Sequence, residues 1–232
     1  IPHHALEAYL SRFMKTGYRV VICEQVGQPS SSPGLLAREV VRIVTPGTIV
    51  EPTLLDSKRN NFLVAVITNE SEAGIAYADI TTSEFSTTQV SLDGLAAELE
   101  RLNPAELLVP DNHNGDLNQR TVMLSPDYFN EGTATKVLLK HFGSTTLTPF
   151  GCARLPLSIR ACGALLSYLK DTRKEALQQL DSLHTYTTNQ YMALDYQTRR
   201  NLELFEGGRF GDGLSLLKAL DLTKTPMGGR ML

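Results

Sequence analysis

Apolar positions in the first fifty residues follow a helical pattern and then an extended one. Residues 2–16 place apolar side chains at helical spacing, and Gly17 suits the end of that helix because glycine adopts the left-handed conformation without strain. Two strand-like runs follow, Arg19–Cys23 and Val40–Val44. One helix and two strands are few for an independent domain, so we expect residues 1–50 to complete a sheet that begins upstream.

Turn-forming residues separate these two strands and close the second one. The glycine, proline and serine residues at 27–34 predict a loop, and Thr45-Pro46-Gly47 predicts a turn. The predicted order in this region is therefore helix, strand, loop, strand and turn.

Residues 61–149 carry short β-rich runs first and helical stripes afterwards. A nearly continuous apolar run is typical of a strand buried on both faces, and short polar turns between such runs predict hairpins. The expected strands are Phe62–Ile67, Ile75–Ile80, Phe85–Val90, Glu106–Val109 and Val122–Leu124. The expected helices are one capped by Ser91 with Leu92, Leu95, Leu99 and Leu102 on one face, one over Thr133–Phe142, and a short one near residues 113–118.

This order of elements, β-β-β-α-β-β-α, predicts an α/β (α+β) fold. It matches a ribonuclease-H-like fold, in which helices pack on a mixed five-stranded sheet. We expect residues 60–150 to form this unit. The partial α+β domain of residues 1–50 precedes it, and a truncated all-α domain over residues 155–232 follows it.

The predicted all-α region shows almost no β pattern. An apolar stripe at helical spacing runs from Leu155 to Leu169, and a second includes Leu194, Leu202 and Phe205 and ends at Gly207-Gly208. Leu214–Leu220 predicts a further short helix. The chain begins with isoleucine instead of methionine and stops inside what reads as a starting helix, so we expect a segment of a longer protein.

Composition and charge narrow the class of protein. With 42% hydrophobic and 20% charged residues among 232, the chain is globular, and collagen, extended disorder and a coiled coil are excluded. No apolar stretch approaches the length of a membrane span, about 18 residues. The net charge of −3 is unlike a protein that only binds nucleic acid, so any DNA function is local or supplied by other parts. Three cysteines without a Cys-x-x-Cys pair fit a reducing compartment.

Candidate chemistry is sparse. His3-His4 lack a third metal ligand at helical spacing, since Glu7 is only a loose candidate, and no glycine-rich phosphate loop occurs. Gly211-Asp212-Gly213 follows a helix and predicts a turn, and the short basic clusters Lys58-Arg59 and Arg199-Arg200 are typical of solvated faces. We therefore name no catalytic, cofactor-binding or metal-binding residue.

A nuclease is the alternative that the predicted fold raises. Active ribonuclease-H-like enzymes hold metal-binding carboxylates on the first strand, first helix and fourth strand. Here the first strand has no acid; the nearby acids are Asp79 on the second strand, Glu98 and Glu100 on the helix, and Glu106 at the start of the fourth strand. This set is incomplete, so the fold is expected to act as a scaffold. A metal-dependent cleavage assay separates the two classes.

Three segments resemble the MutS family of DNA mismatch-repair proteins. They are Ile1-Pro2-His3-His4-Ala5 with Leu6–Leu10, Cys23-Glu24-Gln25-Val26-Gly27 with Arg38–Thr48, and Arg199–Gly207 with matching positions over Ser215–Arg230. Asn103–Leu107 and Gly163–Asp171 strengthen the resemblance, which covers the whole chain.

The resemblance implies a role for each region. Residues 1–50 resemble the tail of the mismatch-binding domain, residues 60–150 the connector domain, and residues 155–232 the start of the helical core or lever domain. The whole protein would be a dimeric, DNA-binding ATPase that uses ATP and Mg²⁺. It would recognise mispaired and unpaired bases and recruit a MutL-type partner, with no membrane involved, in the bacterial cytoplasm at the nucleoid.

The same resemblance places the family's chemistry outside this chain. The Phe-x-Glu wedge that contacts the mispaired base is expected before Ile1, and the phosphate loop, magnesium-binding acids and DNA clamp after Leu232. Phe129-Asn130-Glu131 has the wedge pattern but lies in the connector, so the role is not carried over. We expect this chain itself not to be an enzyme. It would connect the mismatch and ATPase domains mechanically, with the helix Thr133–Phe142 forming part of the MutL-docking surface.

Overall fold

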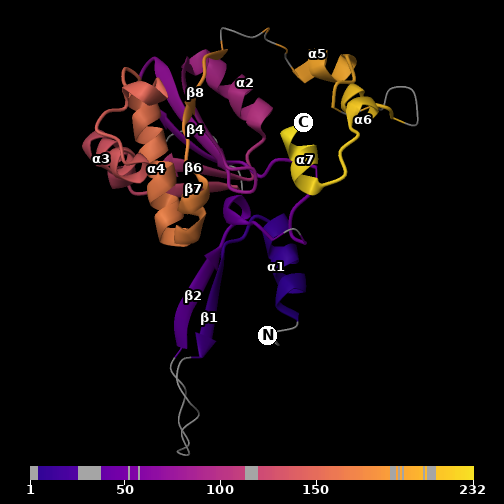
Figure 1. Ribbon diagram of the computed structural model, residues 1–232, viewed down its shortest axis with the longest axis horizontal. Coiled ribbons are helices and arrows are strands. Elements are labelled where there is room, and N and C mark those ends of the chain that lie inside the picture. The colour runs from indigo at the N-terminus through magenta and orange to yellow at the C-terminus, as the bar shows by residue number, and fades with distance from the viewer. Residues whose placement is uncertain are drawn as a thin grey trace, which may run out of the picture.

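A computed structural model gives the arrangement of the chain (Figure 1). The structure describes residues 5–25, 38–51, 53–56, 58–112, 120–188, 192, 194, 196–205, 207 and 213–232. The loop expected at 27–34, the short helix expected near 113–118 and the Gly211-Asp212 pair lie outside these residues.

Most of the expected elements are present. The strands are β1 (Val20–Gln25), β2 (Arg38–Val44), β3 (Leu63–Thr68), β4 (Glu72–Asp79), β5 (Glu84–Ser91), β6 (Glu106–Pro110), β7 (Thr121–Leu124) and β8 (His184–Thr185). The α-helices are α1 (Leu6–Lys15), α2 (Leu92–Leu102), α3 (Glu131–Phe142), α4 (Pro156–Thr172), α5 (Tyr196–Asn201), α6 (Leu216–Leu220) and α7 (Pro226–Met231). Short 3₁₀ turns span Pro46–Thr48, Pro126–Phe129, Thr148–Phe150 and Lys174–Gln179.

The first unit is a hairpin with a helix beside it. β1 and β2 pair antiparallel from Val20 opposite Val44, with a bulge after Ile22. Gly17, at φ +79°, follows α1 and confirms the expected helix end. A small core of its own holds the unit together, formed by Leu10, Met14, Val44 and Ile49. In Figure 1 this hairpin points away from the large sheet.

The second unit is the large sheet, whose strand order is β7-β6-β3-β4-β5-β8. β3, β4 and β5 are antiparallel neighbours, while β6 runs parallel to β3 and β7 parallel to β6. This mixed sheet confirms the expected fold class. β8 adds a sixth strand, parallel to β5, within a region where almost no β pattern was expected. A two-residue strand is too short to show alternation, so its sequence carries no signal.

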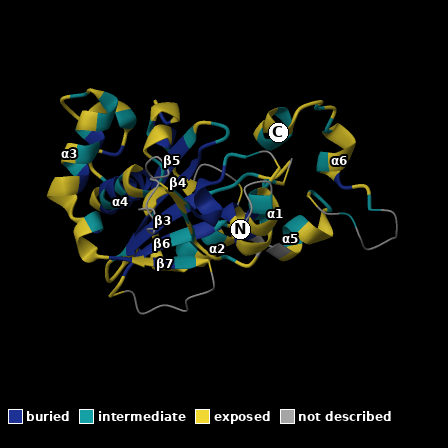
Figure 2. Ribbon diagram, turned by 90° about the horizontal axis from the view of Figure 1, so that it is seen from below, coloured by how far each residue is buried: buried dark blue, intermediate teal, exposed yellow. Residues whose placement is uncertain are grey.

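Helices cover both faces of the sheet. α2 packs on one face, over Val64, Val66 and Tyr77, and α4 packs on the other, with α3 packed against α4. Figure 2 shows α4 and the strands as the most buried part of the molecule. The sequence grouped α4 with the helices after it, but its leucines are buried against the sheet. An apolar stripe reveals a helix's buried face and not which surface covers it. The domain boundaries themselves stay a prediction.

The region after β8 is less buried. α5 ends at Asn201, and Glu203 with φ +48° turns the chain, so the helix expected to reach Gly207 is shorter. Leu202, Phe205 and Leu216 are 56%, 60% and 52% exposed and therefore remain without a covering surface in the described chain. Ser91 precedes α2 as expected, although its side chain makes no capping bond. No helix among the described residues is long and apolar enough to cross a membrane.

Candidate functional site

The chain passes from the hairpin to the sheet through a compact turn. The turn closes on itself, because Thr48 N–H donates to the Thr45 carbonyl at 3.0 Å and Thr45 N–H donates to Thr48 Oγ1 at 3.2 Å. Residues 45–48 are all buried, as polar groups can be when their hydrogen bonds are satisfied. We call this turn, together with the side chains that hold it, the joint.

Glu106 at the start of β6 anchors the joint to the sheet. Its Oε2 accepts hydrogen bonds from Thr45 Oγ1, at 2.5 Å, and from the backbone N–H of Gly47, at 2.9 Å. Its Oε1 accepts from the Tyr168 hydroxyl at 2.5 Å. One carboxyl group therefore connects the end of the hairpin, the central sheet and α4.

Burial governs the protonation of this cluster. Glu106 is 1% exposed, and the loss of water raises the pKa of its carboxyl, although the bonds from Thr45, Tyr168 and Gly47 oppose the rise. Burial and the neighbouring Glu106 carboxyl also raise the pKa of the Tyr168 hydroxyl, which stays protonated and donates. The guanidinium of Arg19, the residue before β1, lies 6.0 Å from the Tyr168 ring centre and adds a positive charge to this cluster.

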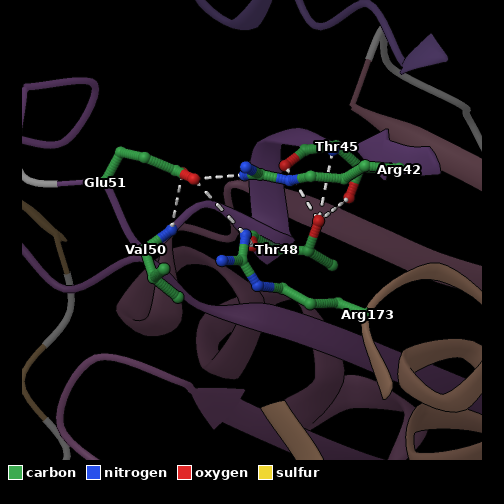
Figure 3. A network of polar contacts seen from close by, with 6 residues as sticks. All are labelled: Arg42, Thr45, Thr48, Val50, Glu51 and Arg173. Atoms are coloured by element: carbon green, nitrogen blue, oxygen red, sulfur yellow. Dashed lines mark hydrogen bonds and ion pairs between the residues drawn. The ribbon is translucent and has the colours of Figure 1, made fainter. Parts of the chain in front are cut away.

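A second polar cluster fastens the other side of the turn (Figure 3). Glu51 bonds to Arg42 of β2, and the same carboxylate oxygen lies 3.7 Å from Nη1 of Arg173, just beyond α4. Arg173 Nη1 also donates to the Thr48 carbonyl at 3.1 Å. Burial opposes the charge on Glu51, but the bond and charge of Arg42 with the charge of Arg173 outweigh it and lower the pKa of the Glu51 carboxyl.

A pocket of about 230 Å³ lies over the joint. It opens between the end of α1 and the edge strand β7, and Glu106 contributes to its lining. Arg19 and Arg120 also line it. Both arginines are exposed, so the pocket beside the joint is open to solvent.

The carboxylates considered for a nuclease are held separately. Asp79 accepts from Asn61 N–H and Thr81, Glu98 pairs with Arg101 and Tyr186, and Glu106 belongs to the joint. Among the residues that the structure describes, no three histidine, cysteine or acidic side chains form a group that could hold a metal ion. The arrangement gives a two-metal nuclease no support.

The remaining sequence candidates are also placed. Phe129 is 1% exposed in the core, so it cannot stack on a base, and the wedge pattern around it is structural. Arg199 pairs with Glu100 at 4.0 Å and Lys58 pairs with Asp221, so both basic clusters have acidic neighbours. His3 and His4 lie outside the described residues.

The described residues form no site that fits ATP or Mg²⁺. The 232 residues contain no Gly-Lys phosphate loop, and the described carboxylates do not gather.

Sequence reasoning did not single out the joint. Thr45-Pro46-Gly47 was recognised as a turn and Glu106 as an isolated acid, but nothing local connects them across 59 residues from Gly47 to Glu106. The one signal in the sequence was Glu106 itself, an acidic residue at the start of an otherwise apolar strand. Such a carboxyl group is expected to be buried, and a buried carboxylate needs hydrogen-bond partners.

Comparison with known families places both units. The family model described as MutS domain II matches residues 61–181, which contain strands β3 to β7 of the sheet with α2, α3 and α4. The model described as MutS domain I matches residues 1–53, which contain the hairpin. The chain belongs to the MutS family. The joint therefore lies where the two matched domains meet.

Relatives within the MutS family are similar along the whole chain. DNA mismatch repair protein MutS of a Dehalococcoides mccartyi strain is 50% identical over 238 residues, which cover 100% of this chain and 28% of that protein. The MutS proteins of Thermosynechococcus vestitus and Trichormus variabilis are 43% and 44% identical, again over 100% of this chain and over 29% and 30% of their own lengths. The chain spans less than a third of these relatives.

Proposed function

We propose that this chain acts in DNA mismatch repair, within a protein that recognises mispaired and unpaired bases in duplex DNA. Its own part is mechanical: it holds the end of the mismatch-binding domain on the connector domain and transmits the placement of one to the other. The observation that carries this proposal is the Glu106 cluster, which ties the two matched domains together through buried hydrogen bonds.

The physical argument concerns how two distant sites influence each other. Sites communicate only if they share a coupling free energy, and that energy travels through packed elements and polar networks with discrete arrangements. The hairpin and the sheet have separate apolar cores. The buried polar contacts of the joint are therefore suited to fix the hairpin's orientation while allowing the two cores to stay intact.

ATP hydrolysis would take place in other parts of the longer protein. By family membership it would be a DNA-dependent ATPase that uses ATP and Mg²⁺ and forms a dimer. We further propose that α3 contributes to docking of a MutL-type partner, because Lys136 and Lys140 are exposed on a helix that is packed against α4. Reversing both charges should weaken capture of the partner by the longer protein, while reversing Arg154, an exposed arginine between α3 and α4, should not.

The test compares a G·T mismatched duplex with its matched control by fluorescence anisotropy at about 150 mM salt, where exposed charges are screened beyond about 8 Å. The longer protein should prefer the mismatch at least about tenfold, a difference of about 1.4 kcal/mol. The 232-residue chain alone, at net charge −3, should show little preference. Absence of any preference in the longer protein would refute the proposed function.

A further inference from the structure

A line of hydrogen bonds leads from the joint toward the end of the chain. Asn61, just before β3, donates from Nδ2 to the Pro46 carbonyl oxygen at 2.9 Å. The backbone N–H of Asn61 donates to Asp79 Oδ2, also at 2.9 Å. One residue therefore bonds to the turn after the hairpin with its side chain and to the end of β4 with its backbone.

The line continues through Asp79, which is fully buried. Its Oδ1 accepts from Thr81 N–H at 2.8 Å and from Thr81 Oγ1 at 2.6 Å. The Thr81 hydroxyl in turn accepts from Arg230 Nη1 of α7 at 2.9 Å. Each donor in this line faces an acceptor, and such chains of hydrogen bonds strengthen one another.

Two further contacts hold α7, and the residue that follows α6, on the same short segment. Arg230 Nη2 donates to the Asp56 carbonyl oxygen at 3.1 Å, and Lys58 pairs with Asp221. Gly229 packs so closely that a Cβ atom on it would lie 3.0 Å from Lys58 Cγ. Asn61 thus contacts the turn after the hairpin, while Asp56 and Lys58 contact α7.

We propose that Asn61 and Asp79 are positioning residues that couple the placement of α7 to the placement of the hairpin. This rests on the proposed function and deepens it, because it names the contacts by which residues after 181, which neither family model covers, act on the mismatch-binding unit. When Arg230 moves away, the Thr81 hydroxyl loses its donor, and the position of Asp79 is less well fixed. Asp79 accepts the hydrogen bond that holds the Asn61 backbone, so the bond from the Asn61 side chain to Pro46 weakens as well.

Hydrogen exchange of the 232-residue chain tests the coupling, read at the amides of β1 and β2 with those of β3 as the internal reference. Arg230→Gln should speed exchange in the hairpin about threefold to tenfold, the scale of one hydrogen bond, and leave β3 unchanged. In an Asn61→Ser background the same substitution should add nothing, because the line is already interrupted. Arg230→Lys keeps a donor for Thr81 and should restore slow exchange.

Two matched variants keep the outcome decisive. Arg199→Gln removes an arginine pair with Glu100 on α2, away from the line, and should leave hairpin exchange unchanged. Thr81→Val interrupts the line at a different link. If Asn61→Ser folds poorly, Thr81→Val replaces it as the background, and Arg230→Gln should again add nothing there. Unchanged hairpin exchange in Arg230→Gln, or equal effects of Arg230→Gln in all backgrounds, would overturn the coupling. No DNA is present, so loss of mismatch preference in the longer protein would refute the proposed function without altering this result.

Discussion

Gly47 lies so close to Glu106 that a Cβ atom on Gly47 would sit 2.9 Å from both the Cβ and the Oε2 atoms of Glu106. The same virtual atom would also sit 2.9 Å from Leu63 Cδ1, in the central strand. The turn can therefore seat on the sheet only with glycine at this position, and the close approach lets the Gly47 N–H reach the carboxyl.

Gly47→Ala should destabilise the chain by about 1–3 kcal/mol through overpacking at the joint. Urea unfolding monitored by circular dichroism measures the change in midpoint. The control is Gly132→Ala on α3, where the nearest atom to a new Cβ, Asn130 Oδ1, lies at an ordinary 3.5 Å. A Gly47→Ala protein as stable as this control would contradict the close packing.

Gly163 makes an even closer approach between α4 and α3. A Cβ atom there would lie 2.3 Å from the Cβ and 2.4 Å from the Cα of Ala134. Gly163→Ala should therefore force the two helices apart and destabilise the chain by about 3 kcal/mol or more. Gly94→Ala in α2, where a new Cβ would make only ordinary contacts, the nearest with Ser91 Oγ at 3.6 Å, should instead stabilise slightly because alanine favours helix by about 1 kcal/mol. Differential scanning calorimetry of both variants should give melting temperatures that move in opposite directions.

Local signals in the sequence were sufficient for most of the sheet. The nearly continuous apolar run Phe62–Ile67 identifies a buried strand, and the helical period of the leucines identifies α2. The order of elements then indicates the fold. β8 was missed because two residues hold no period. The burial of α4 against the sheet, and of Glu106 against Thr45, depends on contacts between residues far apart in the chain, which no single segment encodes.

Glu106 should make the joint weaker as the pH rises. Its pKa in the folded chain is raised above the ordinary 4.5, so the folded state holds the proton more tightly than the unfolded state. The stability of the wild type relative to Glu106→Gln should be greatest below pH 4.5 and fall as the pH rises through the raised pKa. Urea unfolding midpoints of the wild type and Glu106→Gln, measured from pH 4.5 upward, give the difference in stability between them. The contributions of all other titrating groups cancel in this difference. A difference that grows with pH would show that the charged carboxylate is the favoured form.

Glu51 should show the opposite dependence. Its pKa is lowered in the folded chain by the Arg42 bond and the Arg42 and Arg173 charges, so its contribution is present above pH 4.5 and is lost as the pH falls through the lowered pKa. Because the pair is partly exposed and solvent screens it, Glu51→Gln should cost about 1 kcal/mol or less at neutral pH. The same urea titration, extended to acid pH, should show the two variants' differences changing in opposite directions. Parallel curves for Glu51→Gln and Glu106→Gln would contradict the separate assignment.

Pulsed electron paramagnetic resonance between the hairpin and the sheet tests the central claim most directly. Cys23 is exposed on β1 and accepts a spin label, while Cys152 and Cys162 are buried with raised thiol pKa values. A second label enters through Lys140→Cys on the exposed side of α3. The Glu106 joint predicts a single narrow distance distribution, which Glu106→Ala broadens while the chain stays folded. A broad distribution in the otherwise unaltered chain, or a narrow one that survives Glu106→Ala, would contradict the claim that Glu106 fixes the hairpin on the sheet.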